Sequence, residues 1–97
     1  MPENYWGIPP DVAWTGDADR VVVLRLSGDG ETPQAMEGPA AAIWRVIARG
    51  PVTVGEIADR LAEEYEAEPD SLRADVSSFV AQLAQRYFVA PTERIAG

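Results

Sequence analysis

Carboxylates and hydroxyls are the side chains of this sequence that could carry chemistry, because it contains no histidine, cysteine or lysine. Those three residue types supply most enzymatic nucleophiles, general bases and transition-metal ligands. The densest acidic group lies where one expected helix ends and a loop begins, which is typical of a solvated surface: Glu63, Glu64, Glu66 and Glu68. The residue types therefore predict a binding protein rather than an enzyme, with no cofactor and no metal site.

Two short segments could in principle bind ions. Asp17 and Asp19 suggest a calcium loop, but the twelfth position from each is Gly28 or Gly30, where an EF-hand needs glutamate. The segment Gly28-Asp29-Gly30 is not followed by an expected helix, so a phosphate-binding loop is unsupported. Both segments are interpreted as turns.

Length and charge narrow the function classes. The 97 residues fit one domain, and sixteen acidic against eight basic residues give a net charge of −8. The basic residues are all arginines, scattered from Arg20 to Arg94, whereas a nucleic-acid binder needs roughly 6–10 clustered phosphate contacts. No apolar run reaches the ~18 residues of a membrane span, and the start lacks a signal-peptide pattern. We expect a cytoplasmic protein with no nucleic-acid or membrane partner.

The first third of the sequence predicts a three-stranded antiparallel meander. An extended segment containing Val12 and Trp14 is followed by the β-branched run Arg20–Leu26, the clearest strand in the chain. A glycine-rich turn over Ser27–Gly30 leads to a third strand, Glu31–Met36. Pro33 restricts this third strand to an edge position, because proline has no N–H to donate to a neighbouring strand.

Three helices are expected after the meander. The first lies between Gly38-Pro39 and Gly50-Pro51. The second begins with a capping box made by Thr53 and Glu56. The third runs from about Glu68 to about Tyr87 and has an apolar stripe at helical spacing, made by Leu72, Val76, Phe79, Val80, Leu83 and Tyr87. The predicted fold class is α+β, a winged helix-turn-helix.

The domain organisation follows from these elements. Residues 1–10 contain three prolines and no periodicity, so we expect an irregular N-terminal arm. Residues 11–90 are expected to form the folded domain, and residues 91–97 a flexible tail.

Three functions suit a small winged helix. A DNA-binding regulator needs a basic recognition helix, but Asp70 and Asp75 lie among the few polar side chains of the third helix. Capture of an extended peptide would use the free edge of the third strand and an apolar groove beside it. An adaptor for a folded protein partner is the remaining alternative.

The residues also carry a resemblance to a known family. The order and spacing of several segments over about residues 11 to 89 resemble the PqqD family: DVAWT, RVVVLRL, Ala41-Ala42-Ile43-Trp44, the block Thr53–Tyr65, and Ala74-Asp75-Val76 with Phe79 and Leu83. The resemblance implies a recognition element that binds the leader segment of a ribosomally made precursor peptide. Such a protein acts as a peptide chaperone in natural-product biosynthesis, for example in lasso-peptide or PQQ-like pathways.

The resemblance also implies a site and partners. The leader would add as a strand to Glu31, Thr32, Pro33, Gln34, Ala35 and Met36, and would contact the third helix through Leu72, Arg73, Val76, Phe79 and Val80. The implied partners are the leader and a modifying enzyme or leader protease of the same pathway. On this basis Val76→Asp is expected to abolish leader binding while leaving the fold largely intact.

The third strand departs from the family pattern. Many members are rich in aromatic residues there, whereas this chain reads Glu-Thr-Pro-Gln-Ala-Met from residue 31 to residue 36. Pro33 removes one backbone donor, either from the leader side or from the sheet side. The sequence motif of the leader therefore does not carry over.

Overall fold

The computed structural model describes residues 4–17, 19–26 and 32–93. The chain forms, in order, β1 (Tyr5–Gly7), β2 (Val12–Gly16), β3 (Arg20–Arg25), β4 (Gln34–Glu37), α1 (Pro39–Ala48), α2 (Val54–Tyr65), α3 (Pro69–Gln85) and β5 (Ala90–Thr92). An antiparallel sheet followed by three helices confirms the predicted α+β class. "Winged helix" describes it only loosely, because β1 and β5 form a second sheet that the sequence did not predict.

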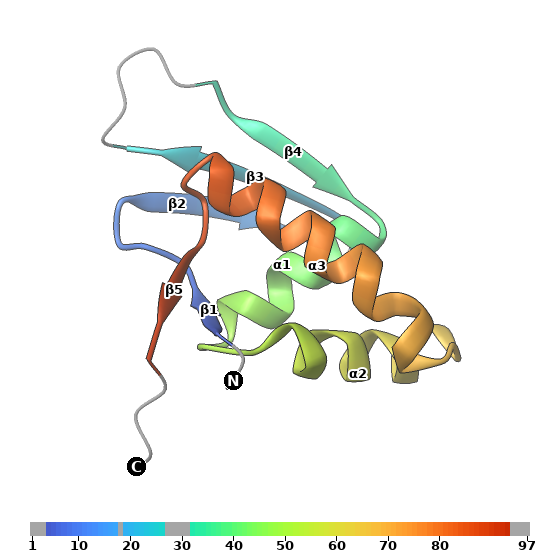
Figure 1. Ribbon diagram of the computed structural model, residues 1–97. Helices are drawn as coiled ribbons and strands as arrows, with labels where there is room; N and C mark the ends of the chain where they lie inside the picture. The colour runs from blue at the N-terminus through green and yellow to red at the C-terminus, as the bar shows by residue number, and fades with distance from the viewer. Residues whose placement is uncertain (1–3, 18, 27–31, 94–97) are drawn as a thin grey trace.

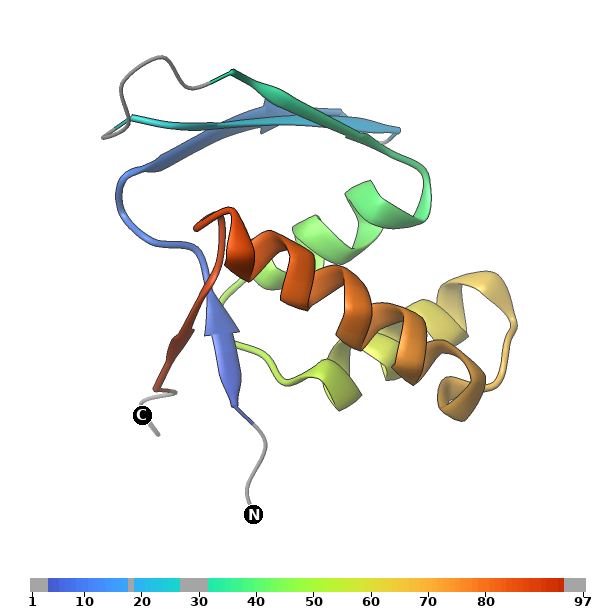
Figure 2. The ribbon, with the colours of Figure 1, turned by 45° about the horizontal axis from the view of Figure 1, so that its top comes forward.

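The larger sheet has the strand order β2-β3-β4. All three helices lie on one of its faces, and the opposite face is bare (Figure 2). In β3 the side chains of Val21 and Val23 point towards the helices and are fully buried, while those of Val22 and Leu24 are half-buried. This alternation is the period of two that a strand imposes on its side chains.

The smaller sheet ties the two ends of the domain together. β1 pairs antiparallel with β5, with Trp6 opposite Pro91, and Trp6 also forms a bridge with Val52. The irregular arm expected for residues 1–10 thus contains a strand, and so does the start of the expected tail. Each of these strands has three residues, and they come from opposite ends of the chain. No pattern of neighbouring residues in the sequence therefore indicates that they pair.

Local signals place the helix boundaries. The predicted capping box is present: the Glu56 N–H donates to Thr53 Oγ1 (3.1 Å), and the Thr53 N–H donates to Glu56 Oε1 (3.0 Å). α3 ends at Gln85, two residues earlier than the Tyr87 predicted, because Tyr87 adopts a left-handed backbone with φ of 65°. A left-handed residue terminates an α-helix.

We expect Thr53→Ala to lower the free energy of unfolding by about 1 kcal/mol, because the Glu56 N–H in the first turn of α2 loses its acceptor, Thr53 Oγ1. In a domain of this size the midpoint of thermal unfolding should fall by about 4–8 °C. Thr53→Ser keeps the hydroxyl acceptor and serves as the matched control. Circular dichroism melts check both variants, and equal losses in the two would contradict the capping role.

The core lies between the sheet and the helices. Its largest fully buried side chains come from every layer: Trp44, Ile47, Ile57, Val21, Val23, Val76, Val80 and Val89. Trp14 of β2 packs edge-on against Trp44, with ring centroids 6.3 Å apart. Within the described residues no polar or charged side chain is buried, so hydrophobic packing holds the layers together. In the same part of the chain no helix is long and apolar enough to cross a membrane.

Candidate functional site

β4 has an open edge. Within the described residues this strand is paired only with β3, and Gln34 lies opposite Val23. The Gly38 N–H donates to the Asp19 carbonyl (3.3 Å), which makes these two residues a hydrogen-bonded pair. Such pairs alternate along an antiparallel ladder, so Met36 and Gln34 bond to β3. The N–H and C=O groups of Ala35 and Glu37 therefore point away from the sheet and are available to an added strand.

A shallow apolar groove runs beside this edge, where α3 passes beneath β4 (Figure 1). Its volume is about 130 Å³, and β4, α3 and the segment after α3 line it with Gln34, Ala35, Met36, Phe79, Gln82, Leu83, Arg86 and Phe88. Met36, Leu83 and Phe88 are buried and form its floor. Phe79 is half-buried and packs against the core, which leaves part of its ring accessible from the groove.

One end of the groove is polar. Arg86 Nη1 donates a hydrogen bond to Gln34 Oε1 (2.8 Å), which links the C-terminal end of α3 to the start of β4. Beyond this bond lies a second hollow of about 500 Å³, lined by Arg25, Thr32, Gln34, Gln85, Arg86, Tyr87 and Phe88. The two hollows share Gln34, Arg86 and Phe88 and form one continuous surface.

The residues predicted on the third strand divide into three groups. Gln34, Ala35 and Met36 belong to β4 and line the groove. Thr32 and Pro33 are exposed and precede β4, so the strand is shifted relative to the Glu31–Met36 range predicted. The position of Glu31 lies outside the described residues.

Only Phe79 of the five predicted helix residues lines the groove. Val76 and Val80 are each 1% exposed and belong to the core, and they do not line this groove. Leu72 is half-buried and packs against the core. The sequence-based prediction assigned one apolar stripe of α3 to both the core and the groove. In the structure most side chains of that stripe pack in the core.

Arg73 does not line the groove either. It lines a different hollow, together with Asn4, Trp6, Val54 and Ser77. Two residues that are six positions apart on an α-helix differ by about 120° in direction around the helix axis. Arg73 and Phe79 therefore point to different sides of α3. The structure therefore does not bring Arg73 to β4.

Four groove residues were missed by the sequence-based site: Gln82, Leu83, Arg86 and Phe88. Three of them follow Phe79 at intervals of three, four and seven residues, which is the spacing of one helix face. Extending the face of Phe79 towards the end of the helix could have identified them.

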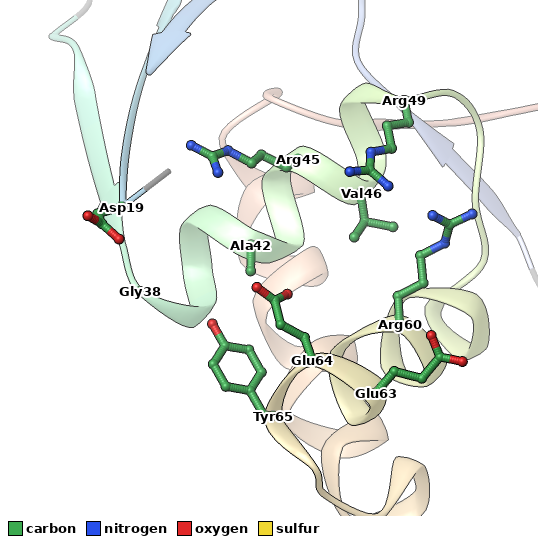
Figure 3. Close-up of a pocket in the computed structure, with 10 residues that line it drawn as sticks. All are labelled: Asp19, Gly38, Ala42, Arg45, Val46, Arg49, Arg60, Glu63, Glu64 and Tyr65. Carbon is green, nitrogen blue, oxygen red and sulfur yellow. The ribbon is translucent and has the colours of Figure 1, made fainter. Parts of the chain in front are cut away.

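Another hollow lies between α1 and α2 (Figure 3). It measures about 510 Å³ and contains both signs of charge: Arg45, Arg49 and Arg60 with Asp19, Glu63 and Glu64. Neither α1 nor α2 offers unpaired backbone groups along its length, because a helix satisfies its own amides. This hollow has no means to bind an extended backbone.

The other sequence candidates remain turns or surface. The Asp17 carboxylate accepts hydrogen bonds from the backbone N–H groups of Asp19 (2.9 Å) and Arg20 (3.1 Å). These bonds favour the charged form and hold the pKa of Asp17 below its ordinary value. Among the described residues no acidic side chains gather into a group that could hold a metal ion.

Comparisons with solved structures place this arrangement among known folds. The chain is similar to TbiB1 in complex with the TbiA(beta) leader peptide, with 23% identity, a TM-score of 0.77, and coverage of 91% of this chain and 99% of that one. It is also similar to lasso peptide synthetase B1 complexed with the leader peptide, with 20% identity, a TM-score of 0.72, and coverage of 89% and 98%. No curated protein matches significantly.

A third solved structure is the PqqD truncation of Methylobacterium extorquens PqqCD, described as a functional, stand-alone RiPP recognition element. Its identity to this chain is 26% and its TM-score 0.69, with coverage of 89% of this chain and 88% of that one. An α+β domain with an open edge strand above a helix-lined groove thus has the fold of a RiPP recognition element. The chain belongs to the PqqD family, since the family model described as coenzyme PQQ synthesis protein D matches residues 21–89.

Proposed function

We propose that this protein binds the leader segment of a ribosomally synthesised precursor peptide by strand addition to β4, and presents it to the modifying enzymes. The observation that carries the proposal is the open edge of β4 directly above the α3 groove. The presence of leader peptides in two of the similar structures supports it. The protein itself catalyses nothing in this proposal, in keeping with the lack of histidine, cysteine and lysine.

Energetic estimates indicate what the site must supply. The free groups of Ala35 and Glu37 offer two donors and two acceptors, and each backbone bond contributes about 0.5–1.5 kcal/mol. Ordering a disordered peptide costs about 2–5 kcal/mol or more, so these bonds alone bind weakly. One apolar leader side chain buried against Phe79 adds about 1.5–3 kcal/mol. Apolar contacts in the groove therefore supply the free energy that makes leader binding tight, and the backbone bonds to β4 fix the register of the leader.

Pro33 fits the leader side of this arrangement. Backbone groups of alternate residues point to the same side of a strand, and Pro33 is two residues from Ala35 and four from Glu37. If β4 is extended towards the N-terminus, the Pro33 nitrogen, which carries no hydrogen, faces the open edge. We infer that proline removes a donor from the leader and leaves the β3–β4 ladder intact. Proline on an edge strand is tolerated in this orientation.

The proposed partners are the leader and a modifying enzyme or leader protease of the same pathway. None of the comparisons supports the DNA-binding alternative. The exposed side of α3 also carries Asp70 and Asp75, which would repel phosphates.

A calorimetric titration with the synthetic leader of the short peptide encoded nearest to this gene tests the proposal. We expect saturable binding near one to one at physiological salt, with a negative heat-capacity change from burial of apolar surface. Amide NMR shifts should concentrate at Ala35, Glu37 and Phe79. A folded protein that binds no leader would contradict the proposal and direct attention to a folded protein partner.

A further inference from the structure

We propose that Arg86 and Arg25 form a carboxylate subsite at the end of the leader groove, so that the leader carries an aspartate or glutamate there. The inference rests on the proposed function and names the chemistry that the site selects. It concerns the hollow of about 500 Å³ that continues the groove past Gln34.

The charge of this hollow is opposite to that of the molecule. The chain has a net charge of −8, yet among the described residues the side chains lining the hollow include Arg25 and Arg86 and no carboxylate. The remaining polar lining, Thr32, Gln34 and Gln85, is neutral. A local concentration of cationic groups on an acidic protein favours an anionic ligand at this place.

Arg25 is held in position from two sides. Its Nε lies 4.0 Å from Asp11 Oδ2, and its guanidinium lies 5.0 Å from the centroid of the Tyr87 ring. The left-handed backbone of Tyr87, with φ of 65°, turns the chain at the end of α3 beside this ring. Arg25 is therefore held in place at the wall of the hollow, where Asp11 balances part of its positive charge.

Arg86 has donors to spare. A guanidinium carries five N–H donors, and the bond to Gln34 Oε1 uses one of them. That acceptor is a neutral amide, whereas a carboxylate can accept two parallel bonds from arginine and is a stronger partner. An incoming acidic side chain could thus replace Gln34 as the partner of Arg86.

The C-terminus of α3 acts against an anion here, because the last carbonyls of a helix carry a partial negative charge. The effect corresponds to about half an elementary charge and is confined to the last turn. Arg86 occupies the C-cap position itself and also lines the hollow. The full charge of Arg86 exceeds the half charge of the helix end, and Arg25 adds a charge that Asp11 partly balances.

The register predicts where the acid lies in the leader. Gln34 and Met36 are two residues apart in β4, so both side chains lie on the face that lines the groove. An added strand has the same period of two. One leader side chain would meet Phe79 beside Met36, and the side chain two positions away would meet Arg86 beside Gln34. We infer a leader with an apolar residue and an acidic residue separated by one residue.

Arg86→Gln tests the subsite, with the synthetic leader of the nearest encoded short peptide as the probe. We expect it to weaken leader binding about tenfold, the loss of one charge-assisted hydrogen bond. Replacing the leader's acidic residue by its amide should weaken wild-type binding to the same extent and leave binding to Arg86→Gln unchanged. Arg73→Gln, on another face of α3, is the matched control and should bind like the wild type.

Gln34→Glu provides an independent test. It places a carboxylate where the Gln34 amide now accepts from Arg86, so an internal ion pair should compete with the leader and weaken binding about tenfold. Amide-substituted leaders that bind the wild type as tightly as the original, or a leader with no acidic residue that binds equally well, would overturn the subsite. No binding of any leader to folded wild-type protein would instead overturn the proposed function.

Discussion

Val76→Asp is expected to unfold the domain rather than to disable the leader groove. Val76 is 1% exposed and lies in the core among apolar side chains. The substitution removes about 1.5–3 kcal/mol of hydrophobic burial and forces a carboxylate into an apolar site. The total cost exceeds about 4–5 kcal/mol, close to the whole stability of many domains, about 5–15 kcal/mol.

Circular dichroism melts and proton–nitrogen NMR spectra measure this effect. We expect Val76→Asp to lose the cooperative thermal transition and the dispersion of its amide signals. Ser78→Asp adds the same charge at an exposed position two residues away and should melt within a few degrees of the wild type. A well-folded Val76→Asp variant would mean that α3 is rotated from the orientation described here.

Ala35→Pro is expected to abolish leader binding while the fold remains intact. The Ala35 N–H points to the open edge of β4, so proline there removes a donor from the leader and none from the ladder to β3. The ring also occupies the space of the incoming backbone. We expect leader affinity to fall at least thirtyfold, about 2 kcal/mol, in a calorimetric titration.

The control for this variant is Ala35→Thr, which adds side-chain bulk at the same position and retains the N–H. It should bind within a few-fold of the wild type, because the Ala35 side chain points to the bare face of the sheet and not into the edge. Unchanged binding by Ala35→Pro would contradict strand addition at β4 and would leave the α3 groove to bind the leader through side chains alone.

The parts of the fold that were predictable from sequence are those with local causes. The β-branched run of β3, the Thr53–Glu56 box and the proline at the start of α1 each determine structure within a few residues. The pairing of β1 with β5 depends on contacts between opposite ends of the chain, so residues 1–10 were expected to be irregular. The left-handed conformation of Tyr87 carried no glycine or asparagine signal.

The site was predictable to the element and not to the residue. The edge strand and α3 named from the sequence both border the observed groove, which Gln34, Ala35, Met36 and Phe79 line. Periodicity shows that a stripe is apolar, but it does not show which of its residues the core buries. The core buries Val76 and Val80, and the groove lies towards the end of the helix, where Gln82 and Arg86 are found.

The open edge of β4 has a consequence for timing. Gln34–Glu37 is extended and paired with β3 before any peptide arrives, so the binding edge is already formed within the described residues. The entropy cost of becoming ordered on binding is then borne by the leader. This cost lowers the affinity, so the complex dissociates readily. In the proposed function, fast exchange would let one copy of this protein deliver many precursor molecules in turn. Each precursor would be released once the modifying enzyme has bound it.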